Sequence, residues 1–196
     1  MLSNLNALIG SRICHDLINP LGAIGNGIEL LGLSGVADSP EMALVTDSVQ
    51  NASAKVRFLR LAFGDATADQ VVQHGEILSV LQAISNGGRV TYSWAVPGDP
   101  PRLDVRVALL AVMCVETALP LGGDIQITHD QSNWTIQTKH DRLSLDPALW
   151  APLSKGEYAD SLTPAQVHFG LLPQMAAQAD RKLAFSHGRD WVAVTF

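Results

Sequence analysis

Apolar residues recur every three or four positions along the start of the chain, and this period constrains the fold more than any other feature. A period near 3.6 residues is typical of an amphipathic helix. The apolar positions are Leu2, Leu5, Ile9, Ile13, Leu17, Leu21, Ile24, Ile28 and Leu31. The pattern predicts one long helix from about Ser3 to Leu31, which Gly32 and Pro40 separate from the next element.

A second helix is predicted to begin at Ser39, a good N-cap residue, with Pro40 at the first helical position. Its apolar residues alternate steps of three and four, as Met42, Val45, Val49, Ala52, Val56, Leu59 and Phe63. Gly64 ends this helix, and the two helices are expected to form an antiparallel hairpin. The first helix also has apolar residues outside its main stripe. We therefore expect a second copy to cover them, in a homodimer with a four-helix bundle at its centre.

The second half of the chain alternates between helical and strand-like patterns. Helices are predicted over residues 76–86, 105–119, 147–153 and 164–180, and strands over 89–96, 124–128, 134–138, 182–186 and 191–196. Helices that alternate with antiparallel hairpins favour a two-layer α/β sandwich. With a polar stretch before it, this pattern predicts a hairpin domain over residues 1–66 and a sandwich domain over residues 75–196.

Composition excludes several classes of protein. No apolar run approaches the roughly 20 residues of a membrane span, and no basic segment of a signal peptide is found. The net charge of −6 argues against a nucleic-acid partner, which binds basic surfaces. Cys14 and Cys114 are the two cysteines and lack metal-ligand spacing, so we expect both to be buried in a cytoplasmic protein.

A line of polar and small residues runs along the first helix. Its members step by three and four residues and share one face: Arg12, His15, Asn19, Gly22 and Asn26. Glycine lowers helix stability and Pro20 removes a backbone hydrogen bond, and such violations of local rules point to a functional site. A neutral imidazole accepts a phosphoryl group well because one ring nitrogen has a free lone pair. His15, in the middle of this line, is therefore a candidate functional residue, and a surface histidine without a role is the alternative.

The segment from His15 to Leu21 resembles the H-box of two-component histidine kinases. In that motif an acidic residue follows the phospho-accepting histidine, and a Thr or Asn and then a Pro come after it. The wider sequence, Ile9 to Asp16 with Gly22 to Gly27, is more similar to the alphaproteobacterial histidine phosphotransferases of the ChpT type. Those proteins are dimeric relays, built like a kinase core that has lost its ATP site.

The resemblance implies a histidine phosphotransferase in a two-component phosphorelay. It would pass a phosphoryl group through His15 between aspartates of receiver domains, one in a hybrid histidine kinase and others in response regulators. Phosphoryl transfer depends mostly on alignment and charge neutralisation. The chain therefore needs no cofactor or metal of its own, and the partner receiver domain would supply the Mg²⁺ and the aspartate.

The nucleotide motifs of the kinases are missing from the second half. A Pro-x-Gly-Gly turn is present at residues 120–123, but Cys114 replaces the Mg²⁺-binding Asn and Thr117 replaces a Lys. The adenine box is expected near residues 139–146, which contain no glycine, and only Gly170 remains of the phosphate loop. Glycines let backbone N–H groups approach phosphate. We therefore expect no ATP binding and no nucleotide site.

The resemblance also implies roles for the neighbours of His15. Asp16 would accept the Nδ1 proton, although adjacent residues point about 100° apart on a helix, so a solvated carboxylate is the alternative. Asn19 would orient a water for dephosphorylation, or is simply a polar surface residue. The predicted partner contacts are Ser11, Arg12, Gly22 and Asn26. Arg12 either holds phosphate oxygens or is a solvated charge, and Gly22 either leaves a notch or is a tolerated small residue.

The remaining histidines share no motif and are predicted at surfaces and turns: His74, His129, His140, His168 and His187. Two other functions remain open, a non-catalytic adaptor that binds receiver domains and an ATP-using kinase with unusual motifs. A metal-dependent phosphohydrolase is excluded, because the turns next to His15 offer no further His or Asp ligands.

Overall fold

The computed structural model describes residues 2–33, 39–86, 88–131, 133–155, 157 and 161–196. By its contacts the chain forms two compact units. Unit 1 comprises Met1–Asp65 and Ser79–Gly87, and unit 2 comprises Ala66–Leu78 and Gly88–Phe196. The domain limits of 1–66 and 75–196 stay a prediction.

The described helices and strands follow the predicted order. The helices are α1 (Leu2–Leu33), α2 (Pro40–Phe63), α3 (His74–Asn86), α4 (Arg102–Thr117), α5 (Pro147–Ser154) and α6 (Val167–Gln178), with a short 3₁₀ turn at Pro164–Gln166. The strands are β1 (Val90–Ala95), β2 (Gly123–Asp130), β3 (Asn133–Lys139), β4 (Ala184–His187) and β5 (Trp191–Thr195). The fold is thus a helical region followed by a mixed α/β sandwich, as the sequence predicts.

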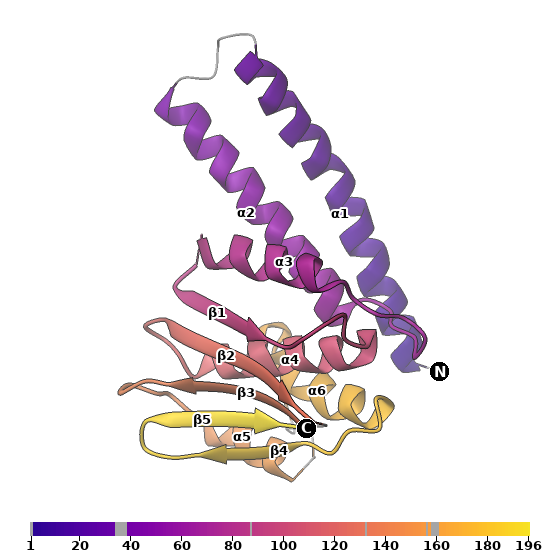
Figure 1. The fold of residues 1–196 in the computed structure, drawn as a ribbon, viewed down its shortest axis with the longest axis vertical. Coiled ribbons are helices and arrows are strands. Elements are labelled where there is room, and N and C mark those ends of the chain that lie inside the picture. Colours follow the sequence, from indigo (N-terminus) through magenta and orange to yellow (C-terminus); the bar gives the residue numbers. More distant parts are fainter. Residues whose placement is uncertain (1, 34–38, 87, 132, 156, 158–160) are drawn as a thin grey trace. The chain divides into compact units, whose positions relative to one another are not determined.

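In unit 1, α1 and α2 run antiparallel as a hairpin (Figure 1). The backbone N–H of Met42 donates to Ser39 Oγ at 3.2 Å, and Pro40 is the first helical residue, so the predicted cap is confirmed. Helix α1 continues through Pro20 without a break in its assignment. Residues 34–38, between the helices, lie outside the described part of the chain.

The predicted seam of α2 holds at all but one of its positions. Met42, Val49, Ala52, Val56, Leu59 and Phe63 are buried or half-buried, but Val45 is 44% exposed. The buried residues of α2 are Ala54, Val56, Phe58, Leu61 and Ala62, most of which lie outside the seam. The heptad pattern identifies one contact face, whereas the C-terminal part of α2 packs on more than one side.

Unit 2 is built on a five-stranded sheet in the order β1-β2-β3-β5-β4. Strands β1 and β2 pair in parallel, and the other neighbours pair antiparallel. The two predicted hairpins, β2–β3 and β4–β5, are therefore confirmed. The parallel pair is joined through α4, the crossover that a parallel connection requires.

Helices α4, α5 and α6 cover one face of this sheet (Figure 1). The strands send large apolar side chains toward them, namely Trp94, Ile125, Ile127, Trp134, Ile136, Val192 and Val194. Helix α4 is buried along nearly its whole length and forms the centre of the core. Polar residues alternate with the buried ones, so the other sheet face exposes Thr91, Ser93, Gln126 and Lys139.

Two predictions about single residues have different outcomes. Cys14 and Cys114 are both free and buried, as expected. The surface position predicted for His168 is wrong, because this residue is 4% exposed in α6 next to α4. One histidine within a moderately apolar helix gives no sign of which face it occupies. Within the described ranges, no helix combines the length and apolar character needed to cross a membrane.

Candidate functional site

Helix α1 has three distinct faces. Successive residues are about 100° apart around a helix. One face, which packs against α2, contains buried or half-buried residues: Gly10, Cys14, Ile18, Leu21, Gly25 and Ile28. A second, apolar stripe lies about 90° away and is 44–55% exposed: Ile9, Ile13, Leu17, Ile24 and Leu31. The polar line of His15 lies more than about 100° from both. The helix therefore presents His15 away from both of these surfaces.

The side chain of His15 is open to solvent. It is 68% exposed, and it extends from the middle of α1 rather than from a loop. A partner can reach the imidazole without any rearrangement of the hairpin. The described structure thus places the candidate acceptor on an accessible face of a long helix.

Asp16 contacts both of its polar neighbours on α1. Its Oδ1 lies 3.3 Å from His15 Nδ1, and its Oδ2 accepts a hydrogen bond from Arg12 Nε at 2.8 Å. The carboxylate therefore bridges an imidazole and a guanidinium. Adjacent residues point about 100° apart on a helix, so this contact requires the two side chains to bend toward each other. The structure contains that contact.

These two contacts lower the pKa of Asp16. The hydrogen bond with His15 is the larger cause, and the hydrogen bond from Arg12 is the next. The Asp16 carboxyl group is consequently ionised at neutral pH and only accepts hydrogen bonds. An ionised carboxylate at this position can accept a hydrogen bond from Nδ1, and this contact favours the His15 tautomer with its proton on Nδ1.

One turn before His15, α1 is attached to the end of α2. The Ser11 hydroxyl accepts a hydrogen bond from the backbone N–H of Asp65 at 2.8 Å. A side chain at Gly10 would lie 3.3 Å from the Phe63 carbonyl oxygen, so glycine permits this close approach. Ser11, predicted as a partner contact, thus has its hydroxyl engaged within the hairpin, and the attachment holds the helix beneath His15.

The other residues of the polar line remain open. Asn19, Gly22 and Asn26 are exposed on α1, and a side chain built at Gly22 would meet nothing within 4 Å. Arg12 is also exposed, at 77% of its side chain, although it pairs with Asp16. The structure therefore keeps Arg12, His15, Asn19, Gly22 and Asn26 on one accessible face. The Arg12–Asp16 ion pair was not among our predictions. Its signal in the sequence is the spacing of four residues between opposite charges on a helix.

The positions that hold nucleotide motifs in kinases have other environments here. Cys114, in place of the Asn, is fully buried, and burial raises the pKa of its thiol. Thr117, in place of the Lys, donates its hydroxyl hydrogen bond to the Cys114 carbonyl oxygen at 2.7 Å. Gly170 lies inside α6, where its backbone belongs to the helix rather than to a phosphate-binding loop.

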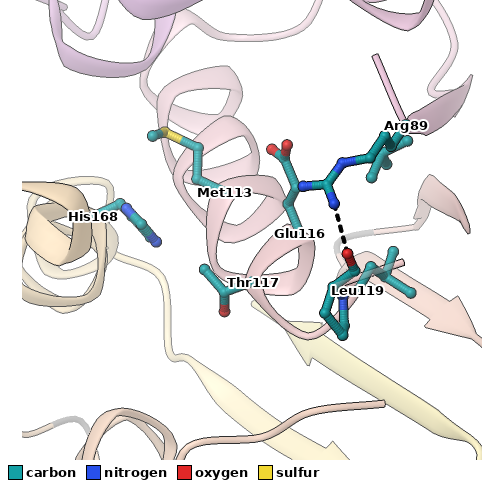
Figure 2. Close-up of a pocket in the computed structure, with 8 residues that line it drawn as sticks. Arg89, Met113, Glu116, Thr117, Leu119 and His168 are labelled. Carbon is teal, nitrogen blue, oxygen red and sulfur yellow. Dashed lines mark hydrogen bonds between the residues drawn. The ribbon is translucent and has the colours of Figure 1, made fainter. Parts of the chain in front are cut away.

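A pocket of about 330 Å³ opens beside the C-terminal end of α4 (Figure 2). Its walls are formed by Arg89, Val90, Met113, Glu116, Thr117, Leu119, Pro120 and His168. Arg89 Nη1 donates to the Pro120 carbonyl oxygen at 2.7 Å. The end of α4 and the Glu116 carboxylate are both negative, and neither favours a phosphate group.

The His168 imidazole in the pocket wall is buried, so its ring nitrogens are not available to bind a ligand. Burial lowers its pKa to about 4, and both ring nitrogens are enclosed without a hydrogen-bond partner among the described residues. Among the described residues, no three His, Cys, Asp or Glu side chains come together as a possible metal site.

Comparisons of the sequence and of the structure with known proteins both find phosphotransferases. A family model described as "Histidine phosphotransferase C-terminal domain" matches residues 74–190, more than half of the chain. "Protein phosphotransferase ChpT" from Brucella abortus (strain 2308) is 36% identical over 132 residues, which are 66% of this chain and 63% of that protein. The aligned part thus spans less than two thirds of this curated relative.

Among solved structures, a bacterial phosphotransferase determined at 1.7 Å is 29% identical, with a TM-score of 0.68. The match covers 94% of this chain and 91% of that one, so it includes both units. The histidine kinase domain of the blue-light activated kinase from Erythrobacter litoralis EL346 is 13% identical, with a TM-score of 0.48, over 94% of this chain and 92% of its own.

Proposed function

The chain belongs to the histidine phosphotransferase family, and from this we propose that it carries a phosphoryl group on His15 between receiver domains of a two-component phosphorelay. The observation that carries the proposal is the pairing of His15 Nδ1 with the Asp16 carboxylate on an exposed helix face. This arrangement leaves Nε2 as the nucleophile. The proposed site is cytoplasmic, where the free thiols of Cys14 and Cys114 stay reduced.

The transfer step needs no further group on this chain. The Nε2 lone pair attacks the phosphorus of a partner's phospho-aspartate, the N–P bond forms, and the aspartyl O–P bond breaks to release the carboxylate. The ring becomes an N-phosphorylated imidazolium that keeps its Nδ1 proton, and the ionised Asp16 stabilises that positive charge. In the second transfer an aspartate of another receiver domain attacks the phosphorus, the N–P bond breaks, and neutral His15 is restored.

The partner receiver domain would supply the Mg²⁺ that neutralises phosphoryl oxygens in this loose transition state. On this chain, Asn19 lies one helical turn from His15 and is exposed. We assign it the role of orienting a water toward the partner's phospho-aspartate, which would reverse the signal. Ser11, Arg12, Gly22 and Asn26 are the proposed contact surface for the receiver domain, and the open space at Gly22 suits a helix of the partner.

We also propose that the hairpin dimerises. In a four-helix bundle each helix packs against two neighbours, on faces about 90° apart. Helix α1 has two such faces, but α2 covers only one, and the stripe of Ile9, Ile13, Leu17, Ile24 and Leu31 is 44–55% exposed. A second hairpin on this stripe would remove that apolar area from water and leave the line of His15 at the surface.

The transfer is proposed to be independent of ATP. The replaced residues Cys114 and Thr117 and the negative end of α4 at the pocket support this view. Magnesium–ATP should therefore leave the melting temperature unchanged, since only a ligand that binds the native state raises it. A rise in melting temperature with Mg–ATP would favour the kinase alternative instead.

The decisive experiment is incubation with a receiver domain phosphorylated on its aspartate. The wild-type chain should become labelled, and the label should be acid-labile and alkali-stable, as a phosphohistidine is. His15→Ala should remain unlabelled, while His187→Ala, at an exposed histidine in β4, should be labelled like the wild type.

The same variants separate a relay from an adaptor. If the chain only binds receiver domains, His15→Gln should preserve both binding and signalling. Label on the His15→Ala protein would reject His15 as the carrier.

A further inference from the structure

The guanidinium of Arg12 holds the Asp16 oxygen that does not face His15. Arg12 Nε donates to Asp16 Oδ2 at 2.8 Å, while Asp16 Oδ1 lies 3.3 Å from His15 Nδ1. We propose that Arg12 is a positioning residue, which acts on His15 through Asp16 rather than by touching the phosphoryl group. This inference rests on the proposed function of His15 and concerns how its imidazole is prepared.

Helix geometry explains why Asp16 needs such a partner. Adjacent residues point about 100° apart, so an unrestrained Asp16 would sample rotamers that face solvent. Arg12 lies four residues before Asp16, on the neighbouring turn, where the two side chains meet naturally. By holding Oδ2, Arg12 turns the carboxylate plane so that Oδ1 faces His15.

The orientation of Asp16 determines which nitrogen of His15 reacts. An ionised carboxylate can only accept a hydrogen bond, so its contact at Nδ1 favours the tautomer with the proton on Nδ1. The low pKa of Asp16, to which both neighbours contribute, keeps the carboxylate ionised. Without Arg12 the carboxylate would turn away more often, and the Nδ1–H tautomer would lose population.

Arg12 is also well placed for the competing role of holding phosphate oxygens. Its side chain is 77% exposed, and arginine binds phosphate through paired N–H groups. The two roles differ in their dependence on Asp16. A positioning role disappears when Asp16 is replaced, whereas a direct phosphate contact does not, so a double-mutant cycle distinguishes them.

The first measurement is the rate of phosphoryl transfer from a phosphorylated receiver domain to wild type, Arg12→Ala, Asp16→Asn and the double variant. Arg12→Ala should slow transfer about two- to fivefold, the range expected for an exposed ion pair. The double variant should be no slower than Asp16→Asn alone. Arg12→Lys, which can still pair with Asp16, should recover part of the rate, and Lys55→Ala on α2 should transfer at the wild-type rate.

The second measurement is the tautomer of His15, from ¹⁵N chemical shifts of the ring at about pH 8.5, above the ordinary histidine pKa. Arg12→Ala should reduce the Nδ1–H population, and Arg12→Lys should restore part of it. This measurement uses the free protein, so it tests the positioning role even if no transfer is found.

Two results would overturn the positioning role. One is an unchanged tautomer ratio in Arg12→Ala. The other is a further loss of the transfer rate at saturating receiver domain when Arg12→Ala is added to Asp16→Asn, because Arg12 would then act on the phosphoryl group directly. A weaker affinity for the receiver domain alone would reflect only the place of Arg12 in the proposed contact surface. Neither result affects the identity of the carrier, which depends on whether His15→Ala still takes up label.

Discussion

His15 and His168 are the same residue type in opposite surroundings. His15 is 68% exposed and contacts an ionised carboxylate, whereas His168 is 4% exposed and has no hydrogen-bond partner among the described residues. Burial without a partner disfavours the charged imidazolium and lowers the pKa of His168 to about 4. The exposed histidine therefore suits chemistry, and the buried one affects stability.

The buried histidine predicts an acid-dependent loss of stability. Between the ordinary pKa of 6.5 and the native value of about 4, the unfolded chain binds a proton that native His168 does not. The free energy of unfolding therefore falls as the pH is lowered through this window, and His168 should account for about 2–3 kcal/mol of the fall by pH 4. Above pH 6.5 it should contribute no pH dependence.

Urea unfolding of wild type and His168→Leu at a series of pH values tests this prediction. The variant should lose less stability on acidification, while His187→Leu, at an exposed histidine, should follow the wild type. Parallel curves for wild type and His168→Leu would mean that other groups cause the acid sensitivity.

At the scale of elements, a partly buried ion pair joins the start of α4 to the segment after α6. Arg181 donates to Asp104 through Nε at 3.0 Å and through Nη2 at 2.7 Å, a bidentate pair. The Asp104 side chain is 6% exposed, and its hydrogen bonds raise the pKa of Arg181. Removal of Asp104 would take two charge-assisted hydrogen bonds from the partly buried Arg181 guanidinium.

Asp104→Ala should therefore lower the free energy of unfolding by about 2–4 kcal/mol, measured by urea denaturation. Asp104→Leu combined with Arg181→Met should cost less than Asp104→Ala alone, because it removes both charges. The exposed pair of Lys139 and Asp190, 3.3 Å apart, provides the matched control. Lys139→Ala should cost less than about 1 kcal/mol, and an equal cost for Lys139→Ala and Asp104→Ala would contradict the role given to burial.

At the scale of the whole molecule, exposed apolar side chains concentrate on the hairpin. Leu8, Ile9, Ile13, Leu17, Ile24, Leu30, Leu31 and Leu33 of α1 are each at least 44% exposed, and so are Leu44 and Val45 of α2. Five of them, the stripe of Ile9, Ile13, Leu17, Ile24 and Leu31, share one face of α1, and an exposed apolar patch of this kind marks an interaction surface. Because the polar line of α1 lies on another face, dimerisation through the stripe leaves both copies of His15 accessible.

Light scattering coupled to size exclusion should accordingly give the wild type a mass of two chains of 20.9 kDa. Ile24→Glu would bury a carboxylate in the bundle, so it should shift the protein toward the single-chain mass. Leu33→Glu is the control, because Leu33 is 86% exposed and lies outside the stripe. A monomeric wild type at micromolar concentration would disprove the dimer.

Local periodicity was enough to predict most elements of this chain. The three- and four-residue steps predict α1 and α2 with their limits, because a helix repeats every 3.6 residues and Ser39 and Pro40 are typical of its start. The same steps place Arg12, His15 and Asn19 on one face. The resemblance of His15–Leu21 to an H-box then predicts His15 as the acceptor before any tertiary contact is known.

Contacts between distant residues, and the choice among rotamers, were decided only by the tertiary structure. Ser11 meets Asp65 and Asp104 meets Arg181 across 54 and 77 positions, a proximity that no local pattern encodes. Asp16 can face solvent or His15 with the same backbone, and its contact with Arg12 selects the second. Sequence periodicity thus determines which residues share a helix face, whereas packing and side-chain pairing determine what each of them touches.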